Sequence, residues 1–306
     1  MAHLIKLEDY ISRYQFDLNR YPSQFSRMKK ERWYYLKLEW EQLQSELEYT
    51  IEKDPRNEHE KRGFFKHAFS MMKIWGKSDQ DQSDHAIEQL SDSGQRMKQM
   101  TFEQLKKSFL DELFQSQLRW ASSSLLEESI LHPRYKYDPW LRFFAQQLPD
   151  NYFFMYKPVF YIKQAAIELD LILISPTEIV CITLVEGKEH SIFEASSDRF
   201  WTEYIDKTRK KRISPLLSMS RMTGVIKGIL EQEGSAFPIH QVVLSPTSMI
   251  DNKIQGAAVN LIDRRNFDSW HERLKKHPSP LKHEQMKVTS LLLNHCYTVS
   301  HKINEV

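Results

Sequence analysis

The sequence predicts an α/β (α+β) protein in which an N-terminal helical region is followed by a mixed sheet flanked by helices. Three observations lead to this prediction. Apolar residues recur at helical spacing through the first part of the chain, up to about residue 130. From Tyr135 onward, short apolar runs bounded by turn residues take over, as is typical of strands. The 306 residues include only 8 glycines, which favours a helix-rich chain with few tight turns.

Helical periodicity runs through residues 4–50 and is interrupted only by Pro22, so we predict a helical hairpin in this region. An aromatic stripe lies on its second half. We expect this stripe to pack between helices, with stacking on nucleic-acid bases as the alternative. The stripe consists of Trp33, Tyr34, Tyr35 and Trp40.

Two further helices are predicted before the sheet. The first covers residues 57–76, and the polar residues 77–95 after it are predicted to form a linker or mobile loop. The second begins after Thr101, whose spacing to Gln104 fits a capping box, and runs to about Ser129.

Asp138 and Pro139 predict the start of the first helix of the α/β part, because Asp is a favourable N-cap and Pro suits the first helical position. The elements expected after it alternate as in an α/β sheet. The expected strands cover residues 152–162, 168–175, 178–185, 191–193, 238–244 and 257–262, and the expected helices cover residues 215–231 and 281–302.

These elements divide the chain into a helical region at 1–130, an α/β domain at 131–270 and a helical tail at 271–306. The N-terminus lacks the apolar core of a signal peptide, and no apolar run approaches the ~18 residues of a membrane span. Cys181 and Cys296 are too few for a disulfide framework. We therefore expect a cytoplasmic protein without membrane contact. The 43 Lys and Arg balance 41 Asp and Glu, so any binding of a polyanion must come from a local patch.

Residues 166–187 are the most informative stretch, because carboxylates lead an apolar strand that turns at once into a second apolar strand. This stretch and the residues after it contain a series of short motifs in a fixed order. They are Glu168-Leu169-Asp170, Ile182-Thr183-Leu184-Val185, Trp201, Ser214-Pro215-Leu216-Leu217-Ser218 and Gln241-Val242-Val243-Leu244. On these residues, segment 135–250 resembles the nuclease-related domain (NERD), a branch of the PD-(D/E)xK nuclease superfamily.

The resemblance implies a site in which two or three carboxylates hold Mg²⁺, which activates water, while a strand Lys assists the reaction. Asp170 occupies the position of the first-strand acid, and Asp138 lies near that of the helix acid, although its N-cap role explains it as well. Thr183 replaces the second-strand Glu and Val185 replaces the Lys. The resemblance therefore implies a nuclease frame with a degenerate site, at which Asp170 binds metal weakly if at all. The alternative for Asp170 is a strand-end residue that pairs with a nearby cation.

A literal Glu-x-Lys, formed by Glu186, Gly187 and Lys188, lies three residues further on. Because strand side chains alternate, this shift places Glu186 and Lys188 on the face opposite Thr183 and Val185. A β-bulge near Gly187 would restore the face. The alternative is that these three residues form a polar hairpin turn.

One local patch favours a polyanion. It follows Trp201 and Tyr204 and directly precedes a helix start at Ser214, an arrangement suited to phosphate contacts. The alternative is a solvated loop. The patch consists of Lys207, Arg209, Lys210, Lys211 and Arg212.

Three functions are consistent with these patterns. The first is a cytoplasmic, bacterial, non-catalytic NERD-like protein that binds DNA, RNA or a partner protein and needs no cofactor. The second is a Mg²⁺-dependent DNA endonuclease that uses the shifted motif. The third is an interaction scaffold that binds a protein partner through the N-terminal helices. The endonuclease would use Asp138, Asp170, Glu186 and Lys188.

Overall fold

The chain folds as an α+β protein with two compact units. One unit comprises Met1–Ser23 and Phe114–Val306, and the other comprises Gln24–Leu113. The helix predicted at 57–76, the linker predicted at 77–95 and Lys207 lie outside the described residues. The computed structural model describes residues 1–52, 97–188, 190–206, 208–254, 259–277 and 279–299.

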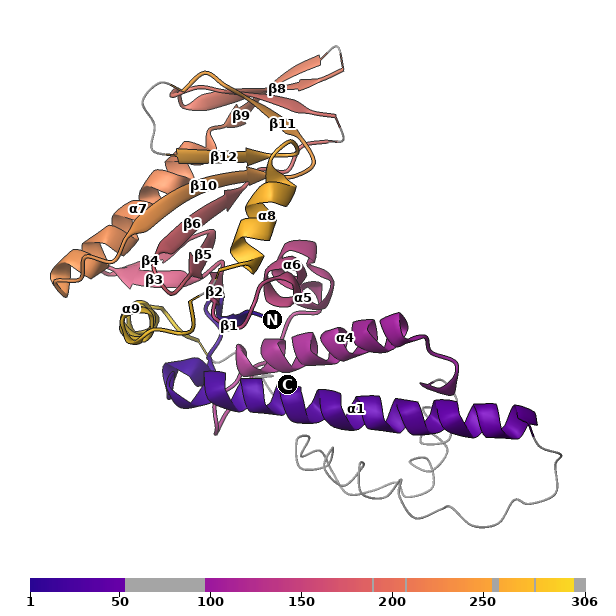
Figure 1. Ribbon diagram of the computed structural model, residues 1–306. Coiled ribbons are helices and arrows are strands. Elements are labelled where there is room, and N and C mark those ends of the chain that lie inside the picture. The colour runs from indigo at the N-terminus through magenta and orange to yellow at the C-terminus, as the bar shows by residue number, and fades with distance from the viewer. Residues whose placement is uncertain (53–96, 189, 207, 255–258, 278, 300–306) are drawn as a thin grey trace, which may run out of the picture. The chain divides into compact units, whose positions relative to one another are not determined.

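A mixed sheet forms the centre of the first unit, with the strand order β1-β2-β5-β6-β10-β12 (Figure 1). The pairs β2/β5 and β5/β6 are antiparallel, whereas β1/β2, β6/β10 and β10/β12 are parallel. The mixed sheet predicted from the sequence is therefore confirmed. Its strands are β1 (His3–Leu7), β2 (Phe153–Tyr156), β5 (Leu171–Ile174), β6 (Ile179–Leu184), β10 (Ile239–Ser245) and β12 (Val259–Asp263).

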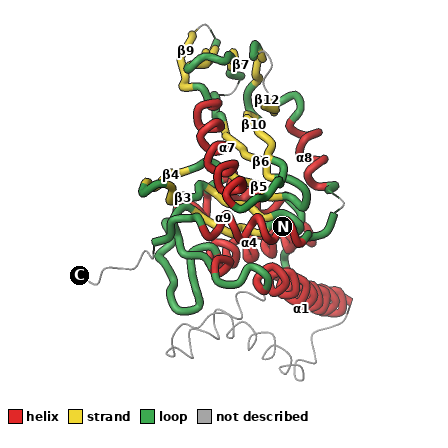
Figure 2. The backbone as a smooth tube through the Cα atoms, turned by 90° about the vertical axis from the view of Figure 1, so that its left-hand side faces the viewer, coloured by secondary structure: helices red, strands yellow, loops and turns green. Residues whose placement is uncertain are grey.

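Helices cover both faces of this sheet. On one face, α6 (Pro139–Gln147), which follows the short α5 (Arg134–Tyr137), and α8 (Phe267–Lys275) pack on a core that includes Leu171 and Ile182. The other face carries α7 (Pro215–Gln232) and α9 (His283–Asn294), which lie in front of the strands in Figure 2. Cys181 of β6 bonds Thr223 of α7 on this side. Neighbouring residues of β6 therefore face different helices, as strand alternation requires.

Two smaller β elements complete the first unit. One is the antiparallel hairpin β3 (Val159–Ile162) and β4 (Ala165–Glu168). The other is a four-stranded sheet in the order β11-β7-β8-β9, in which β9 is an edge strand. The basic run, for which a solvated loop was the alternative, is a strand over Thr208–Ile213, since it pairs residue by residue with β8. Its strands are β11 (Met249–Asn252), β7 (Ile192–Ala195), β8 (Phe200–Ile205) and β9 (Thr208–Ile213).

The helical hairpin predicted at 4–50 is wrong. All five residues of β1 are buried, so its apolar pattern carries no strand period, and the segment pairs with β2. A 3-10 turn at Arg13–Gln15 follows, and then one helix, α1 (Arg20–Glu52). Pro22 lies in the first turn of α1, where its missing N–H is not needed, so it does not separate two helices.

Two strand predictions and one helix prediction also need correction. The strand predicted at 152–162 is divided into β2 and β3 at Lys157, whose φ is 49°. The strand predicted at 168–175 is likewise divided between β4 and β5. The helix α4 (Phe102–Trp120) ends before the predicted Ser129, because serine hydroxyls bond back to its last carbonyls; Ser123 Oγ donates to Arg119 O over 2.6 Å.

The second unit contains the parts of α1 and α4 between Gln24 and Leu113. Trp33 lies 4.9 Å from Phe109 between ring centroids, and Trp40 lies 5.7 Å from Phe102, so these tryptophans pack between the helices. Tyr34 and Tyr35 of the predicted stripe are exposed. The predicted capping box is confirmed by bonds between Thr101 and Gln104 in both directions. No helix among the described residues combines the length and the apolar character that crossing a membrane requires.

Candidate functional site

Asp170 lies at the start of a central strand beside β6, as predicted. It directly precedes β5, and Oδ2 of its carboxylate accepts two hydroxyl bonds. Thr183 Oγ1 of β6 donates over 2.6 Å, and Ser218 Oγ of α7 donates over 2.7 Å. A second carboxylate at Thr183 would repel Asp170 unless a cation lay between them, whereas a hydroxyl donates to it. The polar contacts of Asp170 are thus made within the protein.

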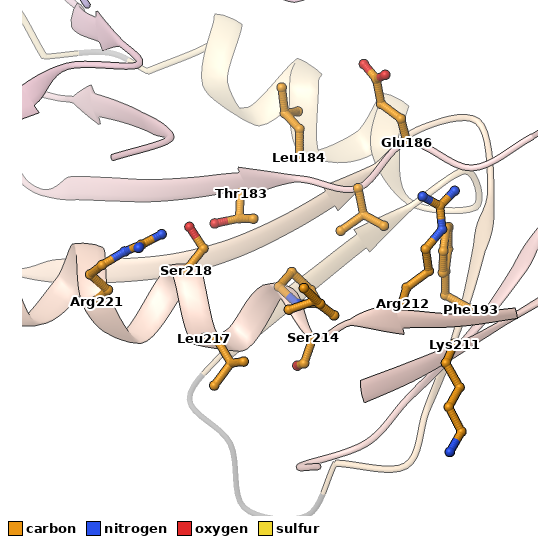
Figure 3. A pocket seen from close by; sticks show the side chains of 13 residues that line it. Thr183, Leu184, Glu186, Phe193, Lys211, Arg212, Ser214, Leu217, Ser218 and Arg221 are labelled. Atoms are coloured by element: carbon orange, nitrogen blue, oxygen red, sulfur yellow. The ribbon is translucent and has the colours of Figure 1, made fainter. Parts of the chain in front are cut away.

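A cavity of about 760 Å³ opens beside this pair (Figure 3). Its walls come from the end of β6, the end of β9 and the first turns of α7. Thr183 and Val185, which stand where the resemblance implies Glu and Lys, both line it. Three cations line it as well, namely Lys211, Arg212 and Arg221.

The start of α7 is fixed by its sequence. Ser214 is the N-cap and its Oγ accepts from Leu216 N over 3.3 Å, while Pro215 occupies the first helical position. The helix predicted at 215–231 is confirmed. Ser218 and Arg221 are three residues apart and therefore share one face of α7, the face that lines the cavity.

The cations of β9 differ in their partners. Arg212 forms an ion pair of 2.7 Å with the buried Glu203. Burial raises the pKa of Glu203, but the bonds from Arg212 and Ser191 outweigh it, and the net pKa is lowered. Lys211 and Arg221 are exposed, and neither has a carboxylate at ion-pair distance within the described part of the chain. These two cations are therefore available to a ligand.

Asp138 and Glu186 lie together, but away from Asp170. Asp138 caps α6 by accepting from Trp140 N and Leu141 N, and Tyr156 OH donates to it over 2.8 Å. Trp140 Nε1 donates to Glu186 over 2.7 Å. Both carboxylates thus belong to the α6 face of the sheet.

The endonuclease residues predicted from the sequence are therefore not brought together. Figure 3 shows Glu186 pointing away from Thr183 and Ser218. The pairing of β6 is regular through Leu184, and strand alternation then places Glu186 on the side of Leu184. The side chain of Lys188 is exposed, and its backbone N–H bonds Glu203. Among the described residues, no three His, Cys, Asp or Glu side chains cluster as metal ligands. This donor set does not fit a Mg²⁺ site.

Residues 138–246 match the family model of the nuclease-related domain, NERD. The chain contains a nuclease-related domain. The match begins at the N-cap of α6 and ends just after β10, so the NERD segment includes Asp170 and every residue that lines the cavity. Neither the curated proteins nor the solved structures provide a significant match to the chain.

Two residues of this site were not predicted from the sequence as site residues. Ser218 belongs to the matching segment Ser214-Pro215-Leu216-Leu217-Ser218, and Arg221 follows that segment. A signal for Arg221 existed, because it follows Ser218 by three residues on a helix whose start was predicted. Lys207 of the predicted basic patch lies outside the described residues, and the patch members Arg209, Lys210, Lys211 and Arg212 all lie on β9.

Proposed function

We propose that the NERD domain of this chain binds nucleic acid through the phosphate backbone and does not cleave it. One observation supports this proposal above all. The cavity at the family position of the nuclease site is lined by Thr183 and Val185 rather than by an acid and a lysine. Lys211 and Arg221 line it too, and neither has a carboxylate at ion-pair distance among the described residues. The site is therefore equipped to attract phosphate and lacks the groups that would activate water against it.

Cleavage is unfavourable for chemical reasons. A neutral threonine hydroxyl does not supply the charge of a carboxylate ligand, and the valine side chain offers neither a cation nor a proton. Loss of one such group costs several kcal/mol of transition-state stabilisation. Asp170 and Glu168 without a third acid among the described residues leave a hard cation weakly held, so we expect Mg²⁺ to bind no more tightly than about millimolar.

Binding to phosphate is favoured by the edge strand β9. Arg209, Lys210 and Lys211 are consecutive and exposed, and no strand of the described sheet pairs with the outer edge of β9. Contacts to phosphate carry no base information, so we expect binding that is independent of nucleic-acid sequence and sensitive to salt. Lysines on an edge strand can also serve to block pairing with the edge of another sheet. Because this role would explain the same residues, binding must be measured directly.

The test is fluorescence anisotropy with a labelled single-stranded oligonucleotide at a series of salt concentrations. Replacing Arg209, Lys210 and Lys211 by Gln should weaken binding and reduce the log–log salt slope by up to about 2. A matched triple variant removes the same charge elsewhere on the NERD-containing unit and should bind like the wild type. It replaces the exposed Lys227, Arg273 and Lys276 by Gln.

Equal weakening in both triple variants would mean that net charge alone governs binding. If the β9 variant binds the oligonucleotide as tightly as the wild type, the cations of β9 do not contact nucleic acid and the support for this function is lost. Thermal unfolding of each variant, compared with the wild type, shows whether the fold is retained.

A further inference from the structure

We propose that the exposed face of the four-stranded sheet is a stacking platform for the unpaired bases of a single nucleic-acid strand. This inference rests on the proposed function, and it specifies the form of nucleic acid and the side chains that receive its bases. It is carried by three observations on the described residues. Aromatic rings of β8 are exposed, cations of β9 lie beside them, and the carboxylates of the same face lie on the other half of the sheet.

The four-stranded sheet has one buried face and one exposed face. Side chains of successive residues lie on opposite faces of a strand, and Figure 3 shows the adjacent Lys211 and Arg212 pointing in opposite directions. The buried face carries Phe193, Trp201, Glu203 and Ile250. The opposite face, which we call the outer face, carries Phe200, Thr202 and Tyr204 of β8 and Arg209, Lys211 and Ile213 of β9. None of these six residues is buried.

Two aromatic rings of β8 lie on the outer face. Phe200 is 45% exposed, and Tyr204 is partly exposed and donates from its hydroxyl to Glu194 Oε2 over 3.2 Å. The two rings are four residues apart, about 13 Å along the strand, so each can receive a separate base. An aromatic ring stacks on the flat face that every base carries. In a duplex those faces are covered by neighbouring bases, so the rings favour a single strand.

Cations of β9 lie directly beside these rings. Arg209 is the cross-strand partner of Tyr204, and Lys211 is the partner of Thr202, which lies between the two rings. Both cations are exposed. Residues paired in this way share a face and have Cβ atoms about 5 Å apart. A strand whose bases stack on β8 would therefore place its phosphates over β9.

The carboxylates of the outer face lie on β7 and β11. Lys253 Nζ donates to Glu194 over 2.7 Å and lies 3.9 Å from Asp251. The bond from Lys253 is the largest influence that lowers the pKa of Glu194, and the attraction of Arg209 contributes less. Negative charge is thus held on one half of the face, while β9 is cationic. This difference directs a phosphate backbone along β9 rather than across the sheet.

The experiment measures binding of three labelled probes of equal length by anisotropy, at a series of salt concentrations. The probes are a single strand, the same sequence as a duplex, and a sugar-phosphate strand without bases. A site that recognises charge alone would bind the single strand and the strand without bases equally. We expect the single strand to bind about fivefold or more tightly than either other probe, because only its bases can stack.

Matched variants separate the rings from the general surface. Phe200→Ala and Tyr204→Ala should each weaken single-strand binding about fivefold or more and leave the log–log salt slope unchanged. Tyr204→Phe keeps the ring and should bind like the wild type. Met249→Ala is the control for apolar surface, because Met249 is an exposed residue on the same face at the opposite edge of the sheet. It should also bind like the wild type.

Photocross-linking locates the bases without any substitution. A single strand that carries 5-iodouracil is irradiated in complex with the wild type, and the protein is digested with trypsin. Cleavage after Arg199 and Lys207 releases one peptide that contains both rings. We expect the main cross-link in this peptide, at Phe200 or Tyr204. Cross-links confined to other peptides would overturn the stacking platform.

The outcomes distinguish this inference from the proposed function. If the single strand binds no more tightly than the other probes, with salt-sensitive binding still present, the stacking platform is overturned and the proposed function stands. Equal weakening of single-strand and duplex binding in Phe200→Ala has the same meaning. A wild-type dimer that Phe200→Ala dissociates, measured by light scattering, would assign the outer face to a second copy of the chain and also overturn the platform. Absence of binding to every probe removes both proposals.

Discussion

The hydroxyl of Thr183 lies 2.6 Å from Oδ2 of Asp170, in the cavity wall where a related nuclease would place a second carboxylate. Ser218 donates to the same oxygen from α7. The two hydroxyls link β6, α7 and the residue that precedes β5 through one carboxylate atom. Thr183, which stands where the resemblance implies a metal-binding carboxylate, thus makes a structural contact in this chain.

Thr183→Val should therefore destabilise the fold, because it keeps the shape of the side chain and removes a donor to a charged acceptor. We expect a loss of about 1.5–3 kcal/mol in the free energy of unfolding, measured with urea. Ser218→Ala should have an effect of the same sign. In the Asp170→Ala background, Thr183→Val should cost much less. An equal cost in both backgrounds would mean that the hydroxyl stabilises something other than the carboxylate.

Gly187 is required by close packing after β6. A Cβ atom at this position would lie 2.5 Å from Ser248 Oγ and 2.8 Å from Ser191 Cβ. Gly187→Ala should therefore cost about 1–3 kcal/mol of stability, in the range of overpacked sites. Gly224→Ala is the matched control, because a Cβ there meets nothing within 4 Å and the residue lies inside α7. It should stabilise the protein by about 0.5–1 kcal/mol. Similar effects at both glycines would contradict the packing argument.

Lys6 should give the protein an alkaline pH dependence. Its side chain is fully buried, and Nζ donates to Tyr10 O over 2.6 Å and to Thr298 Oγ1 over 2.8 Å. Burial lowers the pKa of Lys6 to about 8. Below that pH the amine is protonated in both states. Between about pH 8 and 10 the unfolded chain binds more protons than the folded one, so stability should rise with pH.

The difference in unfolding free energy between the wild type and Lys6→Met isolates this contribution. Measured in urea from pH 7 to pH 10, the difference should change in favour of the wild type as pH rises. Burial raises the pKa of the Cys296 thiol to about 12, so Cys296 has an opposite pH dependence of its own, but both proteins carry this thiol and the difference between them removes most of its contribution. A pH-independent difference would show that the amine keeps its ordinary pKa in the folded protein.

Metal binding should be weak. Titration calorimetry with Mg²⁺ or Mn²⁺ should give dissociation constants no tighter than about millimolar, because among the described residues no third acid joins Asp170 and Glu168. Micromolar affinity in the wild type that disappears in Asp170→Ala would contradict this expectation.

The strands and helices that form the cavity wall were largely predictable, and the reasons are physical. β6, α7 and β10 have strong apolar patterns, and a cap marks the start of α7. β1 was not predictable, since burial on both faces removes its period. The strand β9 was not predictable from the sequence either, because its exposed basic residues show no apolar alternation. It is defined by its pairing with β8.

The site was predictable in part. The order of acid, strand, turn and strand placed Asp170 beside the strand that carries Thr183, and strand alternation predicted that Glu186 would point the other way. The contacts of Ser218 and Arg221 depend on the rotation of α7 about its own axis. Periodicity identifies the buried face of a helix but does not determine which polar residue reaches a given carboxylate.

The most direct test of the central claim is a cleavage assay run on bound nucleic acid. Single-stranded and plasmid DNA are incubated with saturating wild type, Asp170→Ala or Lys188→Ala, in Mg²⁺ and in Mn²⁺, and then analysed for binding and for length. We predict that the wild type retains the DNA at full length and produces no more cuts than either variant. Cleavage by the wild type that is lost in both variants would contradict the account, because it would show that Asp170 and the shifted Glu186-Gly187-Lys188 motif form a working nuclease site.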